Sequence, residues 1–206
     1  MNKDTYEFEN RETDLETYEW DDLWWEHTER RDLPRVTYIG DSISRGTRKV
    51  LNSLAGGKIC FDGFATSKAL DNPYLCHAIS YFAAQQSRCD AVLFNNGLHG
   101  WHLDDQAYEV FYEKTICSIR EIYTGKPIVA VLTTYLGNSE QNKRVMTRNE
   151  ITRRIAEKYG LPILDFYAVS LSNANWLIAD GVHFEKEGYY ALAQAALDFV
   201  LPIVGA

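Results

Sequence analysis

The chain has 206 residues, of which 46% are hydrophobic, and its formal net charge is −8 at pH 7. This size and apolar content predict one α/β domain with a substantial core. Residues 1–32 carry 12 acidic and four basic side chains, while the other 17 acidic and 17 basic residues cancel. A formally neutral body offers no electrostatic basis for binding nucleic acid or an anionic membrane, so we expect no nucleic-acid partner.

Residues 1–34 form an acidic, Trp-rich N-terminal extension, which we separate from a main domain at residues 35–206. Residues 1–14 are typical of a mobile acidic tail. The rest of the extension does not have a disordered composition, because an aromatic cluster lies among the acids: Tyr18, Trp20, Leu23, Trp24 and Trp25. We expect a clamp that packs on the domain or on a dimer partner; the alternative is an aromatic wall or lid near the functional site.

Strand-like apolar runs alternate with helix-like segments along the main domain, which predicts a parallel sheet. The five runs are Val36–Ile39, Lys58–Phe61, Ala91–Phe94, Ile128–Leu132 and Ile163–Phe166. Helical spacing of apolar residues predicts helices at Ile43–Leu54, Asp104–Tyr123, Gln141–Tyr159 and Lys186–Leu201. In open α/β sheets, functional sites form beyond the carboxyl ends of the strands.

Two short motifs, far apart in the chain, carry the residue types of a serine nucleophile system. Gly40-Asp41-Ser42 follows the first strand-like run, so Ser42 would lie at a helix N-terminus, where N–H groups can bind an oxyanion. Near the C-terminus, Asp180-Gly181-Val182-His183 lets one turn present a carboxylate and an imidazole together. A serine hydroxyl needs a base and a carboxylate that orients the base. We interpret Ser42, His183 and Asp180 in these three roles.

In this order and context the motifs resemble the GDSL-type SGNH hydrolases, whose first block is G-D-S and whose last is D-x-x-H. The resemblance spans about Arg35 to Ala206, so residues 35–206 would be an SGNH hydrolase-like catalytic domain. It implies a flavodoxin-like, three-layer α/β/α sandwich with a central, mainly parallel five-stranded sheet. It further implies a serine esterase that forms an acyl-enzyme and needs neither cofactor nor metal. Small acyl esters, including acetyl esters of carbohydrates, are the substrates it suggests.

Two alternatives share the same residues. An O-acyltransferase would use the triad with an alcohol in place of water. A noncatalytic carbohydrate-binding pseudoenzyme would explain a partial match elsewhere in the chain, but it gives no reason for Ser42, Asp180 and His183 to be present together. A nucleotide-binding domain is not favoured, because no G-x-G-x-x-G or P-loop pattern follows a strand-like run.

The oxyanion hole is where the family pattern is matched only in part. The family also has a second block, with a glycine, after the second strand and a third block, G-x-N-D, after the third strand; a glycine amide and the asparagine side chain from these blocks complete the oxyanion hole. The second block here lies within Phe61–Ser67, and the resemblance assigns the donor there to the amide of Gly63 or of a near neighbour. In the third block, aligning Gly97 with the family glycine puts His99 where asparagine is expected. A histidine can still donate a hydrogen bond. We therefore expect the amides of Ser42 and Gly63, together with His99, to hold the oxyanion, with Asn96 as the alternative to His99.

No run of 18 apolar residues is present, so we predict no membrane span. The first residues lack the apolar segment of a signal peptide, which as written indicates a cytoplasmic protein, or an exported one whose signal has been removed. The four cysteines (Cys60, Cys76, Cys89 and Cys117) are scattered and favour neither a zinc site nor a disulfide. The pattern is compatible with a homo-oligomer.

Overall fold

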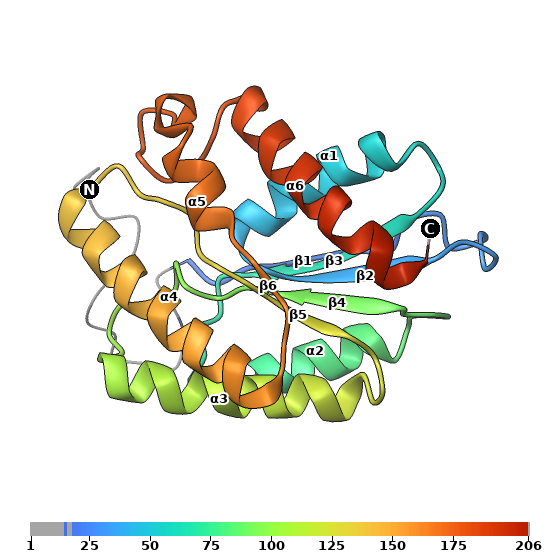
Figure 1. Ribbon diagram of the computed structural model, residues 1–206. Helices are drawn as coiled ribbons and strands as arrows, with labels where there is room; N and C mark the ends of the chain where they lie inside the picture. Colours follow the sequence, from blue (N-terminus) through green and yellow to red (C-terminus); the bar gives the residue numbers. More distant parts are fainter. Residues whose placement is uncertain (1–14, 16–17, 206) are drawn as a thin grey trace.

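The computed structural model describes residue 15 and residues 18–205. Six strands form one sheet: β1 (Asp21–Trp24), β2 (Arg35–Gly40), β3 (Cys60–Thr66), β4 (Ala91–Phe94), β5 (Ile128–Val131) and β6 (Ile163–Leu164). The helices are α1 (Ser42–Ala55), α2 (Leu75–Ala83), α3 (Asp105–Ile122), α4 (Ser139–Tyr159), α5 (Phe166–Leu171) and α6 (Lys186–Val204), with a 3₁₀ turn at Ala174–Trp176. Helices α1, α5 and α6 cover one face of the sheet, and α2, α3 and α4 cover the other (Figure 1). The predicted three-layer α/β/α sandwich is confirmed.

The sheet has the strand order β1-β3-β2-β4-β5-β6. Strands β2 to β6 are parallel to their neighbours, whereas β1 pairs antiparallel with the outer edge of β3. The five predicted strands are thus present, and β1 is an addition. Its sequence, Asp-Asp-Leu-Trp, contains two residues of a type depleted in strands, so pairing with β3 rather than local propensity makes it a strand.

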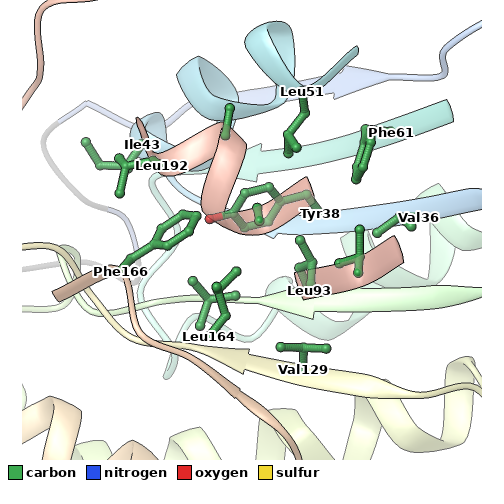
Figure 2. Packing of buried hydrophobic residues seen from close by; sticks show 14 of the residues in the cluster. Val36, Tyr38, Ile43, Leu51, Phe61, Leu93, Val129, Leu164, Phe166 and Leu192 are labelled. Atoms are coloured by element: carbon green, nitrogen blue, oxygen red, sulfur yellow. The ribbon is translucent and has the colours of Figure 1, made fainter. Parts of the chain in front are cut away.

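Strands β4 and β5 are buried on both faces, which is why their sequences are apolar throughout instead of alternating. Tyr38 of β2 faces the layer of α1 and α6, while its neighbour Ile39 faces α2 and α3. On the first face, Leu51 of α1 and Leu192 of α6 meet the sheet side chains (Figure 2). The sheet is thereby fixed between the two helical layers, and the carboxyl ends of β2, β4 and β5 lie along one edge.

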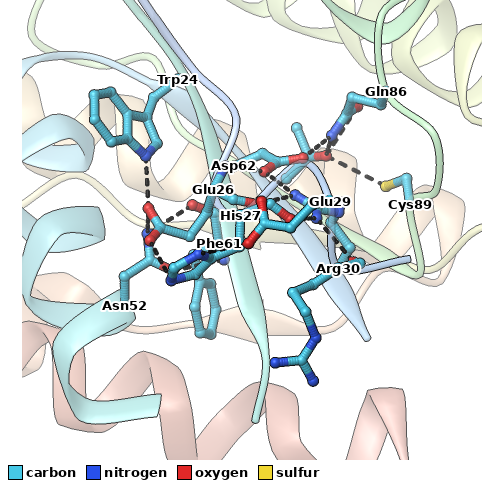
Figure 3. A network of polar contacts seen from close by, with 12 residues as sticks. Trp24, Glu26, His27, Glu29, Arg30, Asn52, Phe61, Asp62, Gln86 and Cys89 are labelled. Atoms are coloured by element: carbon cyan, nitrogen blue, oxygen red, sulfur yellow. Dashed lines mark hydrogen bonds and ion pairs between the residues drawn. The ribbon is translucent and has the colours of Figure 1, made fainter. Parts of the chain in front are cut away.

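The chain just before β2 is anchored by a buried ion pair. The guanidinium of Arg35 pairs with Asp62 of β3 and donates to the carbonyl of Glu26 at 2.7 Å. The Glu26 carboxylate in turn accepts hydrogen bonds from the indole of Trp24 (2.6 Å) and the side chain of Asn52 (3.0 Å) (Figure 3). Residues 24–27 are therefore held to the main domain. The predicted mobile tail at residues 1–14 lies outside the described residues.

Three features bear on the expectations about membranes and metals. Among the helices that the structure describes, none combines the length and the apolar character needed to cross a membrane. Within the same residues, no group of three or more His, Cys, Asp or Glu side chains is arranged to hold a metal ion. All four cysteines are free thiols, and Cys60 is buried in β3.

A glycine sets the distance between the helix that begins at Ser42 and the helix that follows His183. A Cβ on Gly46 of α1 would lie 2.4 Å from the ring of Tyr189 on α6. Such a distance is far below van der Waals contact, so α1 and α6 approach this closely only because residue 46 has no side chain. This contact controls how near the two motifs come to each other.

We predict that Gly46→Ala lowers the free energy of unfolding by about 1 kcal/mol. Helix propensity alone would raise it by about 1 kcal/mol, but overpacking against an aromatic ring costs about 1–3 kcal/mol. Urea unfolding of the wild type, the variant and the double variant Gly46→Ala/Tyr189→Leu, which removes the clash, measures the effect. A single variant more stable than the wild type would contradict the close-approach explanation.

Candidate active site

Ser42 is the first residue of α1, and the chain turns sharply before it. The carboxylate of Asp41 caps the helix by accepting hydrogen bonds from the N–H groups of Ile43 (2.9 Å) and Ser44 (3.4 Å). Gly40 permits the turn, since a Cβ there would lie 2.8 Å from the Ser44 side chain. At this first helical position the N–H of Ser42 has no acceptor within the helix. Its hydroxyl and amide are both placed beyond the carboxyl end of β2.

The capping carboxyl of Asp41 is itself part of the electrostatics of the site. Burial raises the pKa of Asp41, and this effect outweighs the nearby His99 and the two capping N–H groups, which lower it. Within the described residues, its Oδ2 atom has no hydrogen-bond partner. The residue beside the candidate nucleophile is therefore a buried carboxyl that is less acidic than an aspartate in water.

Asp180 and His183 lie on a tight loop, residues 177–184, whose two ends pair through a short β-bridge. Asp180 Oδ1 accepts hydrogen bonds from the backbone N–H groups of Val182 (2.8 Å) and His183 (2.9 Å). Gly181 has a φ of 69°, the left-handed conformation that this turn requires. The two backbone donors fix the carboxylate, so that its other oxygen faces the imidazole ring.

The structure joins the three residues of the two motifs in one hydrogen-bonded chain. His183 Nε2 lies 2.8 Å from Ser42 Oγ, and His183 Nδ1 lies 2.7 Å from Asp180 Oδ2. Partial burial opposes ionisation of Asp180, but the bonds from the His183 and Val182 amides and from the His183 ring lower the pKa of its carboxyl overall. An ionised acceptor at Nδ1 favours the tautomer with hydrogen on Nδ1, so Nε2 can accept the serine proton.

A small cavity of about 20 Å³ opens beside Ser42. It is lined by two polar and four apolar side chains besides the serine: Leu98, His99, Trp101, Leu136, Gln141 and Val182. A volume of this size is about the room of one water-sized group. Of the four predicted oxyanion-hole residues, the structure brings Ser42 and His99 together at this cavity; His99 is only 2% exposed.

Asn96 has a different place from His99. Its side-chain Nδ2 donates to the carbonyl of Lys68 at 3.0 Å, and its own carbonyl accepts from the hydroxyl of Tyr108 at 2.5 Å. Asn96 lies outside the residues that line the cavity and ties the loop after β3 to the end of β4. Between the two predicted alternatives, the geometry favours His99.

The structure contradicts the prediction for Gly63. This glycine lies inside β3, paired with Trp24 on one side and Tyr38 on the other, well before the strand ends at Thr66. Its lack of a side chain makes room for Arg48, because a Cβ would lie 2.4 Å from Arg48 Cδ. The strand predicted from the sequence, Lys58–Phe61, ends before Thr66 because it is followed by Asp62 and Gly63, and residues of these two types disfavour strands. The loop after β3 begins only at Ser67 and contacts the end of β4 through the bond from Asn96 to the Lys68 carbonyl.

Arg148 of α4 holds the segment that carries His99. Its side chain is 1% exposed and donates to the carbonyls of Gly97 (3.0 Å), His99 (2.8 Å) and Gly100 (2.7 Å). The guanidinium also lies 4.8 Å from the ring centroid of Trp101. The planar guanidinium has several N–H donors and can bond to three converging carbonyls at once. A lysine ammonium could not bind them in the same geometry. Arg148 therefore fixes the backbone from which the His99 ring projects.

The sequence reasoning missed Arg148, although the chain carries a signal for it. Arg148 falls on the same helical stripe as Ile151 and Ile155, and this stripe of α4 is buried. Asn149, beside it, exchanges hydrogen bonds with the backbone N–H (2.8 Å) and carbonyl (2.9 Å) of Thr133. Polar residues on an apolar stripe usually have buried hydrogen-bond partners, and here they hold the loops after β4 and β5.

Comparisons with known proteins bear on the fold of the chain. No family model and no curated protein sequence matches the chain. Among solved structures, a G-D-S-L family lipolytic protein from Veillonella parvula has a TM-score of 0.64 and 19% identity, over 80% of this chain and 96% of that one. The acetylxylan esterase Axe2 from Geobacillus stearothermophilus has a TM-score of 0.65 and 17% identity, over 84% and 94% of the two chains.

The C-terminal catalytic domain of peptidoglycan O-acetyltransferase A from Streptococcus pneumoniae is also similar. Its TM-score is 0.65 and its identity 15%, over 83% of this chain and 94% of that one. At these identities the likeness establishes the architecture. The chain has the fold of the SGNH hydrolases, as the sequence resemblance implied.

We predict that Asp180→Asn reverses the tautomer of His183. Asn Oδ1 would keep the two backbone N–H bonds, so its amide nitrogen would face His183 Nδ1 and donate to it. The ring hydrogen would then move to Nε2, which could no longer accept from Ser42. Nitrogen-15 NMR of the neutral imidazole distinguishes the two tautomers.

If the wild type hydrolyses an ester, the kcat of Asp180→Asn should be about 10⁴-fold lower than that of the wild type, and the variant should still fold. Glu185→Gln is the matched control, because it removes the same charge from the residue next to the loop, and the Glu185 side chain makes no capping hydrogen bond on α6. A variant with the wild-type tautomer, or one that turns over as fast as the control, would contradict the orienting role of Asp180.

Proposed function

We propose that the protein is a serine esterase that hydrolyses small acyl esters through an acyl-enzyme. The observation that carries this proposal is the hydrogen-bonded chain from Ser42 Oγ to His183 Nε2 (2.8 Å) and from His183 Nδ1 to Asp180 Oδ2 (2.7 Å). In it Ser42 is the nucleophile, His183 the general base and acid, and Asp180 the orienting carboxylate. The SGNH fold supports the proposal, since esterases share it.

The reaction begins when Ser42 Oγ attacks the ester carbonyl carbon and its proton moves to His183 Nε2. The carbonyl oxygen becomes an oxyanion. When this intermediate collapses, the bond to the alcohol breaks, and His183 gives the proton to the departing alkoxide. Water then attacks the acyl-Ser42 ester, again with His183 as the base, and releases the carboxylic acid and free Ser42.

Two donors beside the cavity would stabilise the oxyanion. The Ser42 N–H lies at the helix N-terminus, where the helix dipole also favours negative charge. His99 lines the same cavity, and its backbone is held by Arg148 at 2.8 Å. A donor from the loop after β3 would take the place that the sequence assigned to Gly63. Such donors are most effective when they are fixed before the charge develops.

The size of the cavity favours a short acyl group. At about 20 Å³, with Leu98, Trp101 and Leu136 among its walls, it has room for a methyl group and little more. Acetyl is the acyl group whose carbon chain beyond the carbonyl is a single methyl. The similarity to an acetylxylan esterase and to a peptidoglycan O-acetyltransferase domain is in line with acetyl chemistry, and an acetylated carbohydrate is the substrate class we propose.

We predict that the purified protein hydrolyses p-nitrophenyl acetate with a kcat/KM at least about tenfold above that for the octanoate, because each extra methylene must find space outside the cavity. Ser42→Ala should lower kcat by about 10⁴-fold or more. Ser53→Ala, a serine substitution on the exposed side of the same helix, is the control. Equal rates for Ser42→Ala and Ser53→Ala would refute the serine mechanism.

The same assay separates an esterase from an O-acyltransferase. With an alcohol acceptor such as a monosaccharide added, an esterase releases mainly acetate, whereas an acyltransferase forms the acetylated sugar at acceptor concentrations far below that of water. The similarity to the O-acetyltransferase domain is the reason to include this arm. If the acetylated sugar is the main product, the reaction of Ser42 is acyl transfer and not hydrolysis.

We predict that His99→Ala lowers kcat by about 100-fold with little change in KM, as expected when one oxyanion donor is lost. His99→Asn, which restores an amide donor, should recover part of the loss. His102→Ala is the control, since His102 bonds to Asp71 at 2.9 Å and lies outside the cavity lining. Wild-type turnover in His99→Ala would transfer the donor role to backbone amides.

A further inference from the structure

The N-terminal extension reaches the active site through three consecutive residues, Glu19, Trp20 and Asp21, which we call the N-terminal clamp. The backbone of Trp20 pairs with the loop that follows β3. Its N–H donates to Ser67 Oγ at 2.8 Å, and its carbonyl accepts from the Ser67 N–H at 3.1 Å. These bonds involve only the main chain of Trp20, so they do not require its side chain.

Charge holds the clamp to the same loop. The Lys68 ammonium lies 2.8 and 2.9 Å from the two carboxylate oxygens of Asp21 and 3.4 Å from Glu19. The hydroxyl of Thr66 donates to Asp21 at 2.6 Å. The Lys68 side chain is only 11% exposed, so these charge-assisted bonds are little screened by solvent. Part of the acidity of the extension thus has a specific cationic partner in the main domain.

The loop bound by the clamp contacts the segment that carries His99. The carbonyl of Lys68 accepts from Asn96 at 3.0 Å, and Asn96 is followed by Gly97, Leu98 and His99. The clamp, the loop after β3 and the loop after β4 therefore form one connected layer at the carboxyl edge of the sheet.

The ring of Trp20 makes the most direct contact with the site. It lies edge-on to the His99 imidazole, with ring centroids 6.4 Å apart and planes at 76°. The guanidinium of Arg45, on α1, lies 5.2 Å from the centre of the Trp20 ring. The indole thus contacts both elements that supply proposed oxyanion donors, α1 with Ser42 and the loop with His99.

We propose that Trp20 is a positioning residue of the active site, which fixes the His99 ring and shields it from water so that the oxyanion hole is formed before substrate binds. This inference rests on the proposed function, because it assigns Trp20 to the step in which the oxyanion develops. A donor in a site closed to water acts in a low dielectric, where its hydrogen bond to a developing charge is stronger. His99, at 2% exposure, is in such an environment.

Trp24 offers a matched comparison within the same extension. Like Trp20, it lies under an arginine of α1, with the Arg48 guanidinium 5.1 Å from its ring centre. Unlike Trp20, it pairs with Gly63 inside β3 and is 49% exposed. Neither tryptophan is among the residues that line the cavity. The two tryptophans therefore share residue type and cation contact, and differ in the contact with His99.

The experiment compares Trp20→Ala, Trp20→Phe and Trp24→Ala in the full chain, by kcat and KM for p-nitrophenyl acetate and by hydrogen–deuterium exchange of residues 95–101. We expect Trp20→Ala to lower kcat by roughly tenfold to 100-fold with KM nearly unchanged, and to speed exchange in that segment. Trp20→Phe should recover most of the turnover, and Trp24→Ala should match the wild type in both measurements.

Equal turnover and equal exchange in Trp20→Ala and Trp24→Ala would overturn the inference and leave Trp20 as a packing residue only. The proposed function is tested separately: it is wrong if the wild type shows no ester hydrolysis that depends on Ser42. In that case the hydrogen–deuterium exchange data alone test the role of Trp20. Faster exchange of residues 95–101 in Trp20→Ala, but not in Trp24→Ala, would support the positioning of His99 by Trp20, and equal exchange would refute it.

Discussion

The contact between Ser42 Oγ and His183 Nε2, at 2.8 Å, is the interaction on which the site depends, although its partners are 141 positions apart in the sequence. It exists because α1, which begins at Ser42, packs beside α6, which follows the His183 loop. Gly46 permits that approach, and the apolar cluster between these helices and the sheet maintains it. The chemistry is therefore set by helix packing as much as by the two motifs themselves.

Much of the fold could be predicted from local sequence, and so could the three hydrogen-bonded residues Ser42, His183 and Asp180. The apolar runs at β2, β4 and β5 are long enough to identify, and Gly40-Asp41-Ser42 at the end of β2 combines a sharp turn with a helix cap. The D-x-x-H spacing likewise determines its own geometry, because the Asp180 carboxylate binds the amides of the turn that presents His183.

What could not be predicted depends on contacts between distant segments. β1 is a strand only because β3 offers it an edge, and β3 continues past Asp62 and Gly63 because Arg35 pairs with the first and Arg48 fills the space above the second. No local pattern contains these partners. The same holds for the loops at the site, where Arg148 and Trp20 reach His99 from the fourth helix and from the N-terminal extension.

The central claim is that Ser42 becomes acylated, and the most direct measurement is mass spectrometry of the protein quenched with acid soon after mixing with p-nitrophenyl acetate. We expect a mass gain of one acetyl group on the peptide that contains Ser42, which decays as acetate is released and which the Ser42→Ala protein lacks. An acetyl group on another residue that turns over at the catalytic rate, or turnover with no adduct on Ser42 at any quench time, would contradict it.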